Sequence, residues 1–284
     1  MNDNNPDIFV YLLIDNGLLD EVSGSYTEAA VSERPKWLAP IYAPSALVVS
    51  PLLIDIEAAY EAGDLDRVMS YLNARTPALH VSIIETELDL EKLAQHLGRF
   101  IFILTPEGKQ FTLRYADCAV LAPLSAVLNT IQWAAMTYPI RSWGIHDRSG
   151  KLVKLPAAEF VAHERTPLRL DHQQLDALDE ASEPDHCIAK VKMMSNGAVL
   201  PGNPVEHYTW AKASYQAWRA AGNSNLLILM FLTEAAVATK GLVLQSNKIQ
   251  EFLIMSEVSL FRSNLREQVN EILDRQICFI DEDN

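Results

Sequence analysis

The sequence predicts an α+β protein, with a mixed α/β N-terminal lobe followed by an all-helical C-terminal lobe. Over roughly the first 150 residues, short apolar runs of strand length are mixed with helical patterns, which is typical of a layered α/β structure. Beyond Pro156 almost every periodic segment has helical spacing. We therefore expect two domains, residues 1–156 and 157–284, with the boundary between Pro156 and Asp171.

Before residue 88, four segments of the N-terminal lobe have the character of strands. Residues 8–14 form a continuous apolar run, which indicates a strand buried on both faces. Apolar runs at 47–56 and 79–84 predict two more strands, and the proline-containing segment 36–42 suits an edge strand. A helical pattern occupies residues 58–73. Its buried side is expected to consist of Leu65, Val68, Met69 and Leu72.

Residues 88–121 carry the clearest local signals in the chain. Apolar residues spaced i, i+3, i+4 and i+7 predict a helix with one buried face. These residues are Leu90, Leu93, Ala94 and Leu97. Asp89 can cap the N-terminus of this helix, and Gly98 can end it in the left-handed conformation.

A hairpin and a second helix are expected directly after this first helix. Residues 100–104 fit a strand, and Thr-Pro-Glu-Gly-Lys at 105–109 supplies a turn. Apolar and polar residues alternate in the next strand, so one of its faces should be buried. The apolar set is Phe111, Leu113 and Tyr115. Asp117 can cap the following helix. The core positions of that helix are Val120, Leu121, Leu124, Val127 and Leu128.

The C-terminal lobe is expected to be a set of helices. Patterns at 157–163, 171–180 and 184–194 are helical. Asn203 can cap a further helix that begins at Pro204. A nearly all-apolar helix runs from residue 224 to 238, as is usual for the central helix of a bundle. Two more helices are expected, with caps at Ser246 and Ser263.

The composition argues against nucleic acid and membranes as partners. The chain has 37 acidic and 23 basic residues, a net charge of −14, and lacks the clustered Lys and Arg that neutralise phosphates. The most apolar run, 226–232, is far shorter than a membrane span of about 20 residues. The excess negative charge either keeps the protein soluble or steers it toward a basic partner.

The cysteines and the N-terminal residues predict a cytoplasmic location. Cys118, Cys187 and Cys278 are widely spaced and form no C-x-x-C pair, which is typical of reduced thiols. The first residues, MNDNNPD, are polar and acidic, so no secretory signal is expected.

The sequence lacks the motifs of the common enzyme classes. We find no nucleophile elbow, no phosphate-binding glycine loop and no dinucleotide fingerprint. Asp185, His186 and Cys187 are adjacent, and neighbouring residues on a helix point about 100° apart, so they cannot chelate a metal together. We expect no enzyme activity, cofactor, metal or small-molecule substrate. The alternative is an enzyme whose His, Asp and Cys residues are brought together only by folding.

Two sets of residues are candidates for partner binding. Arg114, Tyr115 and Asp117 form the most distinctive polar group. Capping by Asp117 with Arg114 nearby explains this group structurally, and an exposed recognition patch is the alternative. The second set is the aromatic stripe of the helix after Asn203. Its Trp218 has the spacing of a core residue, whereas Trp210 falls off that face and is the better interface candidate.

Five short segments of the N-terminal lobe follow one family pattern. They are YLLID at 11–15, SPLLIDI at 50–56, LEKLAQHLGRF at 90–100, TPEGK at 105–109 and RYADCAVL at 114–121. Together they resemble the type VI secretion effector chaperones, also called Tap or Tec adaptors, over about residues 8–155. The last segment is the most specific, because the family has an Arg, an aromatic pair and Asp-Pro before its helix.

This chain departs from the family pattern at two positions of that last segment. Ala116 replaces the second aromatic residue, which implies a shallower aromatic surface, and Cys118 replaces the proline. A proline in the first helical turn is favourable but not required, so the helix cap should be kept.

The resemblance implies a function in binding rather than in catalysis. Members of this family hold a toxic effector in the cytoplasm and help to load it onto the spike-tip protein VgrG. The resemblance therefore predicts an effector and VgrG as partners of this chain. An immunity protein that occludes a toxin is a further alternative.

Overall fold

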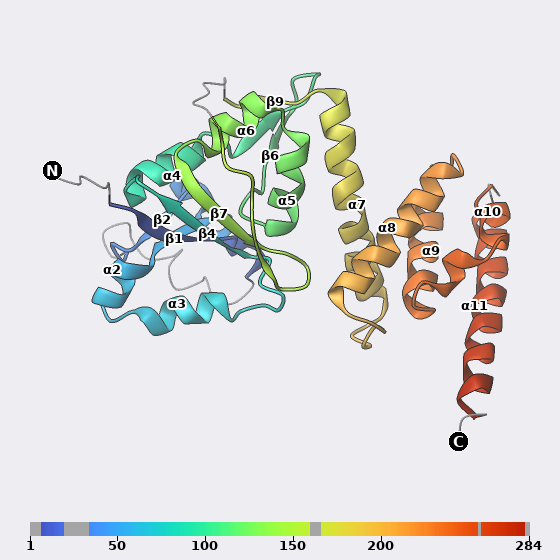
Figure 1. Cartoon of the computed structure of the whole chain (residues 1–284). Helices are drawn as coiled ribbons and strands as arrows, with labels where there is room; N and C mark the ends of the chain where they lie inside the picture. The colour runs from blue at the N-terminus through green and yellow to red at the C-terminus, as the bar shows by residue number, and fades with distance from the viewer. Residues whose placement is uncertain (1–6, 20–33, 160–165, 255–256, 282–284) are drawn as a thin grey trace. The chain divides into compact units, whose positions relative to one another are not determined.

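The computed structural model describes residues 7–19, 34–159, 166–254 and 257–281 (Figure 1). The chain divides into two compact units, Met1–Leu178 and Asp179–Asn284. The first unit combines two β-sheets with helices and the second consists of helices, so the predicted α+β class is confirmed.

The larger sheet of the N-terminal unit has six strands in the order β2-β3-β1-β4-β7-β8. Its strands are β1 (Phe9–Ile14), β2 (Leu38–Pro40), β3 (Leu52–Asp55), β4 (Val81–Thr86), β7 (Ile140–His146) and β8 (Leu152–Lys154). All its pairings are antiparallel. The central strand β1 places Leu12 between Ile54 of β3 and Ile83 of β4. The proline-containing strand β2 lies at an edge, as predicted.

The residues of β1 alternate between two hydrophobic cores. Tyr11 and Leu13 point into the larger core, and Leu12 and Ile14 point into a smaller one. The smaller core is covered by α2 (Ile56–Glu61) and α3 (Leu65–Leu72). The larger core is covered by α4 (Leu90–Gly98), α5 (Cys118–Val127) and α6 (Thr130–Thr137). Helices therefore lie on both faces of the sheet (Figure 1), which explains the continuous apolar run in β1.

A smaller sheet of three strands completes the N-terminal unit. Its members are β5 (Phe102–Leu104), β6 (Gln110–Thr112) and β9 (Leu168–Arg169), in the order β6-β5-β9. β5 and β6 form the predicted hairpin, and Gly108 has the positive φ of +82° that its turn requires. β9 pairs with β5 in parallel. Because β9 joins this sheet and Leu168 and Leu170 lie in the larger core, the structural boundary falls later in the chain than the composition suggested.

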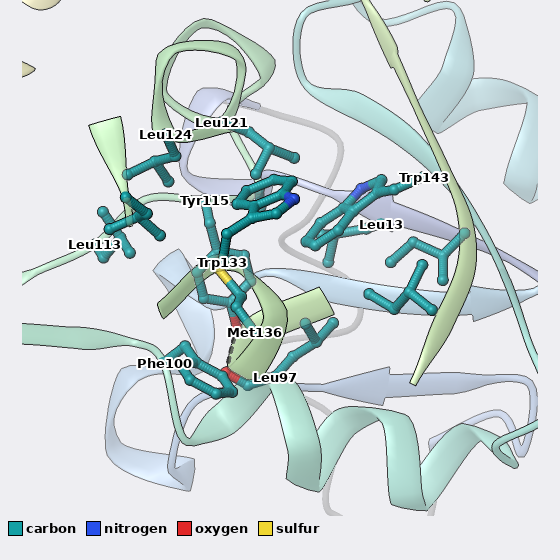
Figure 2. Close-up of a cluster of buried hydrophobic side chains, with 14 of the residues drawn as sticks. Leu13, Leu97, Phe100, Leu113, Tyr115, Leu121, Leu124, Trp133, Met136 and Trp143 are labelled. Atoms are coloured by element: carbon teal, nitrogen blue, oxygen red, sulfur yellow. Dashed lines mark hydrogen bonds between the residues drawn. The ribbon is translucent and has the colours of Figure 1, made fainter. Parts of the chain in front are cut away.

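Tyr115 lies at the centre of the larger core (Figure 2). Its side chain is completely buried, and its hydroxyl donates a hydrogen bond of 2.9 Å to the carbonyl oxygen of Leu97 at the end of α4. Burial raises the pKa of this phenol well above its ordinary value, so the hydroxyl keeps its proton. Tyr115 thus joins the segment before α5 to the end of α4.

The C-terminal unit is built from helices around a separate core. Its helices are α7 (His172–Met194, which begins in the first unit), α8 (Pro204–Ala220), α9 (Leu226–Ala238), η4 (Leu242–Gln245), α10 (Lys248–Leu253) and α11 (Val258–Asp281). Asn203 caps α8 as predicted, and Glu206 completes a capping box. Ile228, Leu229 and Leu232 of α9 are fully buried in this core.

Two predictions for the N-terminal unit are wrong, and each concerns the backbone conformation at one glycine. The helix expected over 58–73 is interrupted at Gly63, which has a φ of +74°. This break turns the second half, so Val68 is buried but Leu65 and Met69 are 36% and 42% exposed. Gly98 does not adopt the left-handed conformation. α4 instead ends in a tight turn in which the amide of Phe100 donates to the carbonyl of Leu97.

Other predicted patterns end earlier or continue further than expected. β6 spans only Gln110–Thr112 and all its residues are exposed, so Phe111 is 53% exposed, whereas Leu113 and Tyr115 beyond the strand are buried. The helices predicted at 171–180 and 184–194 are one continuous helix, α7. Ser263 lies inside α11 and does not cap it. Residues 157–159 are not helical, and the predicted helix there otherwise falls largely outside the described residues.

No helix among the described residues is both long and apolar enough to cross a membrane.

Burial lowers the pKa of two histidines in the N-terminal unit, and both lie beside backbone carbonyls. His80 is fully buried with its Nε2 atom 2.7 Å from the carbonyl oxygen of Tyr71. His96 is partly buried with its Nε2 atom 2.8 Å from that of Met136. Burial lowers the pKa of both imidazoles below the ordinary value of about 6.5. Both rings are therefore neutral in the folded protein near neutral pH.

We predict that removal of the Tyr115 hydroxyl destabilises the protein by the contribution of one hydrogen bond. Tyr115→Phe should lower the free energy of unfolding by about 1 kcal/mol, because the ring stays packed while the bond to Leu97 is lost. Urea denaturation measures this loss. The control Phe111→Leu, at an exposed position, should change stability by less than about 0.5 kcal/mol. An equal loss in both variants would contradict the central position of Tyr115.

We also predict that stability falls on mild acidification. Between about pH 6.5 and their lowered folded-state pKa values, His80 and His96 bind protons in the unfolded chain but not in the folded one. The free energy of unfolding should therefore decrease from about pH 7.5 to about pH 5.5. His96→Gln should reduce this decrease, and an unchanged pH dependence would show that His96 does not contribute.

Candidate functional site

The N-terminal unit contains a hollow where three distant segments of the chain meet. Its volume is about 260 Å³, and we call it the Arg114 hollow. Its lining comes from the end of β1, from the segment between β2 and β3, and from β6 and the chain that follows it. The lining residues are Asp15, Gly17, Tyr42, Val49, Pro51, Thr112, Arg114 and Ala116.

Asp15 anchors one wall of the Arg114 hollow. It follows β1 directly, and its backbone amide donates to the carbonyl of His80 at 2.8 Å. Its side chain is buried and accepts hydrogen bonds from the amide of Gly17 at 3.0 Å and from Nη2 of Arg114 at 2.8 Å. A buried carboxylate requires such partners, because desolvation of an unpaired charge is costly. Asp15 therefore holds Arg114 at the hollow.

Arg114 is the cation of the hollow, and about half of it remains accessible. Its side chain is 47% exposed, whereas that of Asp15 is 4% exposed. Burial opposes the charge on the guanidinium, but the attraction of Asp15 and their hydrogen bond outweigh it and raise the pKa of Arg114. A guanidinium carries several N–H donors in a planar fork. Among the described residues, Arg114 donates one side-chain hydrogen bond, from Nη2 to Asp15. Its other N–H groups remain for a ligand.

Tyr42 contributes a neutral hydroxyl to the same hollow. Its segment is held in place by Ser50, whose Oγ atom accepts from the amides of Ile41 at 3.0 Å and Tyr42 at 2.9 Å. Burial, and then the nearby charge of Asp15, raise the pKa of the Tyr42 phenol. The phenol therefore stays protonated at neutral pH and can donate a hydrogen bond.

The hollow combines polar donors with apolar walls, which is an arrangement for binding. Arg114 and Tyr42 supply donors, and Val49, Pro51 and Ala116 supply apolar surface. Such a site suits a side chain or chain end that carries a carboxylate or carbonyl acceptor.

The two described thiols are not activated as nucleophiles. Burial raises the pKa of the Cys118 thiol to about 12 and that of the Cys187 thiol to about 11, so both are protonated at neutral pH. Among the residues with described positions, no group of three His, Cys, Asp or Glu side chains could hold a metal ion.

The three predicted residues near α5 have different positions. Arg114 lines the hollow, whereas Tyr115 belongs to the hydrophobic core. Asp117 caps α5 by accepting from the amide of Ala119 at 2.9 Å.

Both predicted tryptophans lie in the C-terminal unit. Trp218 is 7% exposed and donates from Nε1 to the carbonyl of Asn225 at 3.1 Å. Trp210 is partly buried against two glycines with positive φ, Gly202 and Gly241. A Cβ atom on either glycine would lie 2.7 Å from the indole ring, so both glycines are needed for this packing. Neither tryptophan lies near the hollow in sequence.

Sequence reasoning missed Asp15, Tyr42 and Val49 as parts of a site. The sequence indicates only that Asp15 belongs to a turn after an apolar run. Its position directly after a buried strand nevertheless indicates a buried carboxylate, and a buried carboxylate needs a cation as its partner. The sequence could not show which cation, since Arg114 is 99 residues away.

Residues 10–135 match the family model described as "Domain of unknown function (DUF4123)". No curated protein and no solved structure gives a significant match to the chain. The matched stretch contains all the described parts of the Arg114 hollow, from Asp15 to Ala116.

We predict that the Asp15–Arg114 pair is asymmetric. Arg114→Met leaves a buried carboxylate without its cation and should cost about 2 kcal/mol, less than for a fully buried pair because Arg114 is half exposed. Asp15→Asn keeps an acceptor for the amide of Gly17 and leaves an arginine that water can reach, so it should cost about 1 kcal/mol.

Chemical denaturation of the two variants measures this asymmetry. The matched control is Lys92→Met, which removes the exposed Lys92–Asp89 ion pair and should cause no measurable loss. If Arg114→Met were as harmless as this control, Asp15 would not depend on Arg114.

Proposed function

We propose that this protein is a type VI secretion adaptor that binds an effector and helps to load it onto the VgrG spike. The resemblance to Tap or Tec adaptors rests on five segments, and all five lie within the stretch that matches the domain of unknown function. The family description gives this domain no function, and we propose adaptor activity as its role.

The observation that carries the proposal is the convergence of three of these five segments at one place. Asp15 ends the first segment, Pro51 belongs to the second, and Arg114 and Ala116 begin the last. In the folded chain all four residues line the Arg114 hollow. Segments that meet at an accessible, donor-rich hollow support a shared binding role.

A binding role also agrees with the chemistry of the described residues. The thiols of Cys118 and Cys187 are protonated, and the carboxylate of the hollow, Asp15, is already paired with Arg114. The proposed adaptor is cytoplasmic and binds proteins rather than a small-molecule substrate.

Co-purification tests the proposed function. The tagged chain is co-expressed with the effector and the VgrG protein encoded beside it, and complexes are separated by size-exclusion chromatography. We expect the effector, VgrG or both to elute with the chain at micromolar concentration. Elution of neither would overturn the proposal. Equimolar inhibition of the toxin by this chain would instead indicate an immunity protein.

We predict that the hollow takes part in this binding. Val49→Glu introduces a charged side chain at a lining residue that is 54% exposed, and it should weaken binding of at least one partner about tenfold. Val199→Glu is the matched control, because Val199 is 97% exposed and lies outside the hollow. Calorimetric titration measures both affinities, and equal affinities would exclude the hollow as a binding site.

A further inference from the structure

The C-terminal unit contains a groove between α9 and α11 that the proposed function does not yet use. Its volume is about 360 Å³, and we call it the α9–α11 groove. α9 contributes Phe231, Ala235 and Ala238, and α11 contributes Leu265 and Val269. These side chains form an apolar floor along two neighbouring helices.

α9 leaves an apolar stripe uncovered along this groove. A helix that is apolar on all sides is normally buried on all sides. Here Ile228 and Leu232 are fully buried, but Leu227, four residues before Phe231 and thus on the same side, is 51% exposed. Ala238 is also exposed. The stripe therefore has the character of a helix face that still lacks a neighbour.

Small residues of α9 make the groove suitable for a helix. Ala235 and Ala238 are three residues apart and share a helix face with Phe231. Their small side chains leave space in which the larger apolar side chains of another helix could pack between the ridges of α9 and α11. Helix-in-groove binding uses this geometry.

The rim of the groove carries two arginines. Arg262 and Arg266 are four residues apart on α11, on the same face as Leu265 and Val269. The guanidinium carbon of Arg262 lies 4.8 Å from the centre of the Phe231 ring, a cation–π contact that places the charge beside the apolar floor. Neither arginine forms an ion pair with any residue that the structure describes.

The charge of the rim is opposite to that of the chain as a whole. The chain has a net charge of −14, yet the groove has two cations against one acid, Glu234. Unpaired arginines beside apolar surface favour a partner that brings carboxylates next to its apolar side chains. The complementary ligand is therefore an acidic amphipathic helix.

We propose that the α9–α11 groove binds an amphipathic helix whose apolar stripe is flanked by acidic residues. The helix inserts its apolar side chains over Phe231 and Ala238, and its carboxylates pair with Arg262 and Arg266. The identification of this helix as part of the effector rests on the proposed function, whereas the chemistry of the groove does not.

A pair of synthetic peptides tests the groove on the full chain. Both are helical peptides of about 18 residues with a leucine stripe, flanked by glutamates in one peptide and by lysines in the other. Fluorescence anisotropy should show at least about tenfold tighter binding of the glutamate peptide. The Arg262→Glu/Arg266→Glu variant should reverse this preference, and Ala238→Trp should weaken binding of the glutamate peptide by filling the groove.

Matched variants control for charge and for bulk. Arg275→Glu makes the same change of charge at an exposed position of α11 that does not line the groove, and Ala220→Trp adds the same bulk at an exposed position of α8. Both should bind the glutamate peptide like the unmodified chain. Equal binding of the two peptides, no binding of either, or no effect of the Arg262→Glu/Arg266→Glu variant would overturn the proposal.

Co-elution with the co-expressed effector and VgrG distinguishes failure of the groove as the effector site from failure of the proposed adaptor function. If the effector elutes with the unmodified chain but not with the Arg262→Glu/Arg266→Glu variant, the groove is its binding site. Equal elution with both would overturn the groove as the effector site and leave the adaptor function intact. If neither the effector nor VgrG elutes with the unmodified chain, the adaptor function fails and the peptide measurements alone decide the groove.

Discussion

The burial of β1 on both faces is the constraint on which the N-terminal unit depends. β1 pairs with β3 on one side and with β4 on the other, so its backbone groups are used within the sheet. Leu13 and Ile14 are fully buried on opposite faces. A strand of this kind is stable only with a layer of helices on each side. α2 and α3 provide one layer and α4 to α6 the other.

The same constraint creates the Arg114 hollow. Asp15 follows β1 without an intervening loop and is therefore drawn into surroundings with little water. The carboxylate needs a cation there, and Arg114 supplies it from the chain between β6 and α5. This pairing is structural in origin, but it leaves half of the guanidinium accessible beside Tyr42 and Val49. In the proposed adaptor, Arg114 therefore has a structural role and a binding role.

The C-terminal unit shows a different relation between packing and charge. Its core is built around α9, and the buried side of that helix is fully packed. On its other side small residues lie beside Arg262 and Arg266, which form no ion pair with any described residue, on a chain with a large negative charge. Exposed apolar surface flanked by uncompensated cations adds little to the stability of a fold. This surface therefore supports the proposed recognition of an acidic helix.

The sequence by itself determined the features that depend on neighbours within about four positions. Asp89, Asp117 and Asn203 cap helices as their patterns predicted, and the α+β class follows. The apolar run at 8–14 forms the strand Phe9–Ile14, of which residues 11–14 are buried. These outcomes need only local hydrogen bonds and periodicity.

Only the tertiary structure decided which distant residues meet. The Asp15–Arg114 pair joins residues far apart in the chain, and β9 extends the N-terminal unit past the change in composition. Trp210, which by spacing seemed free of the core, packs against Gly241. Such contacts produce no periodic pattern in the sequence. The burial and charge pairing that stabilise them exist only once the chain has folded.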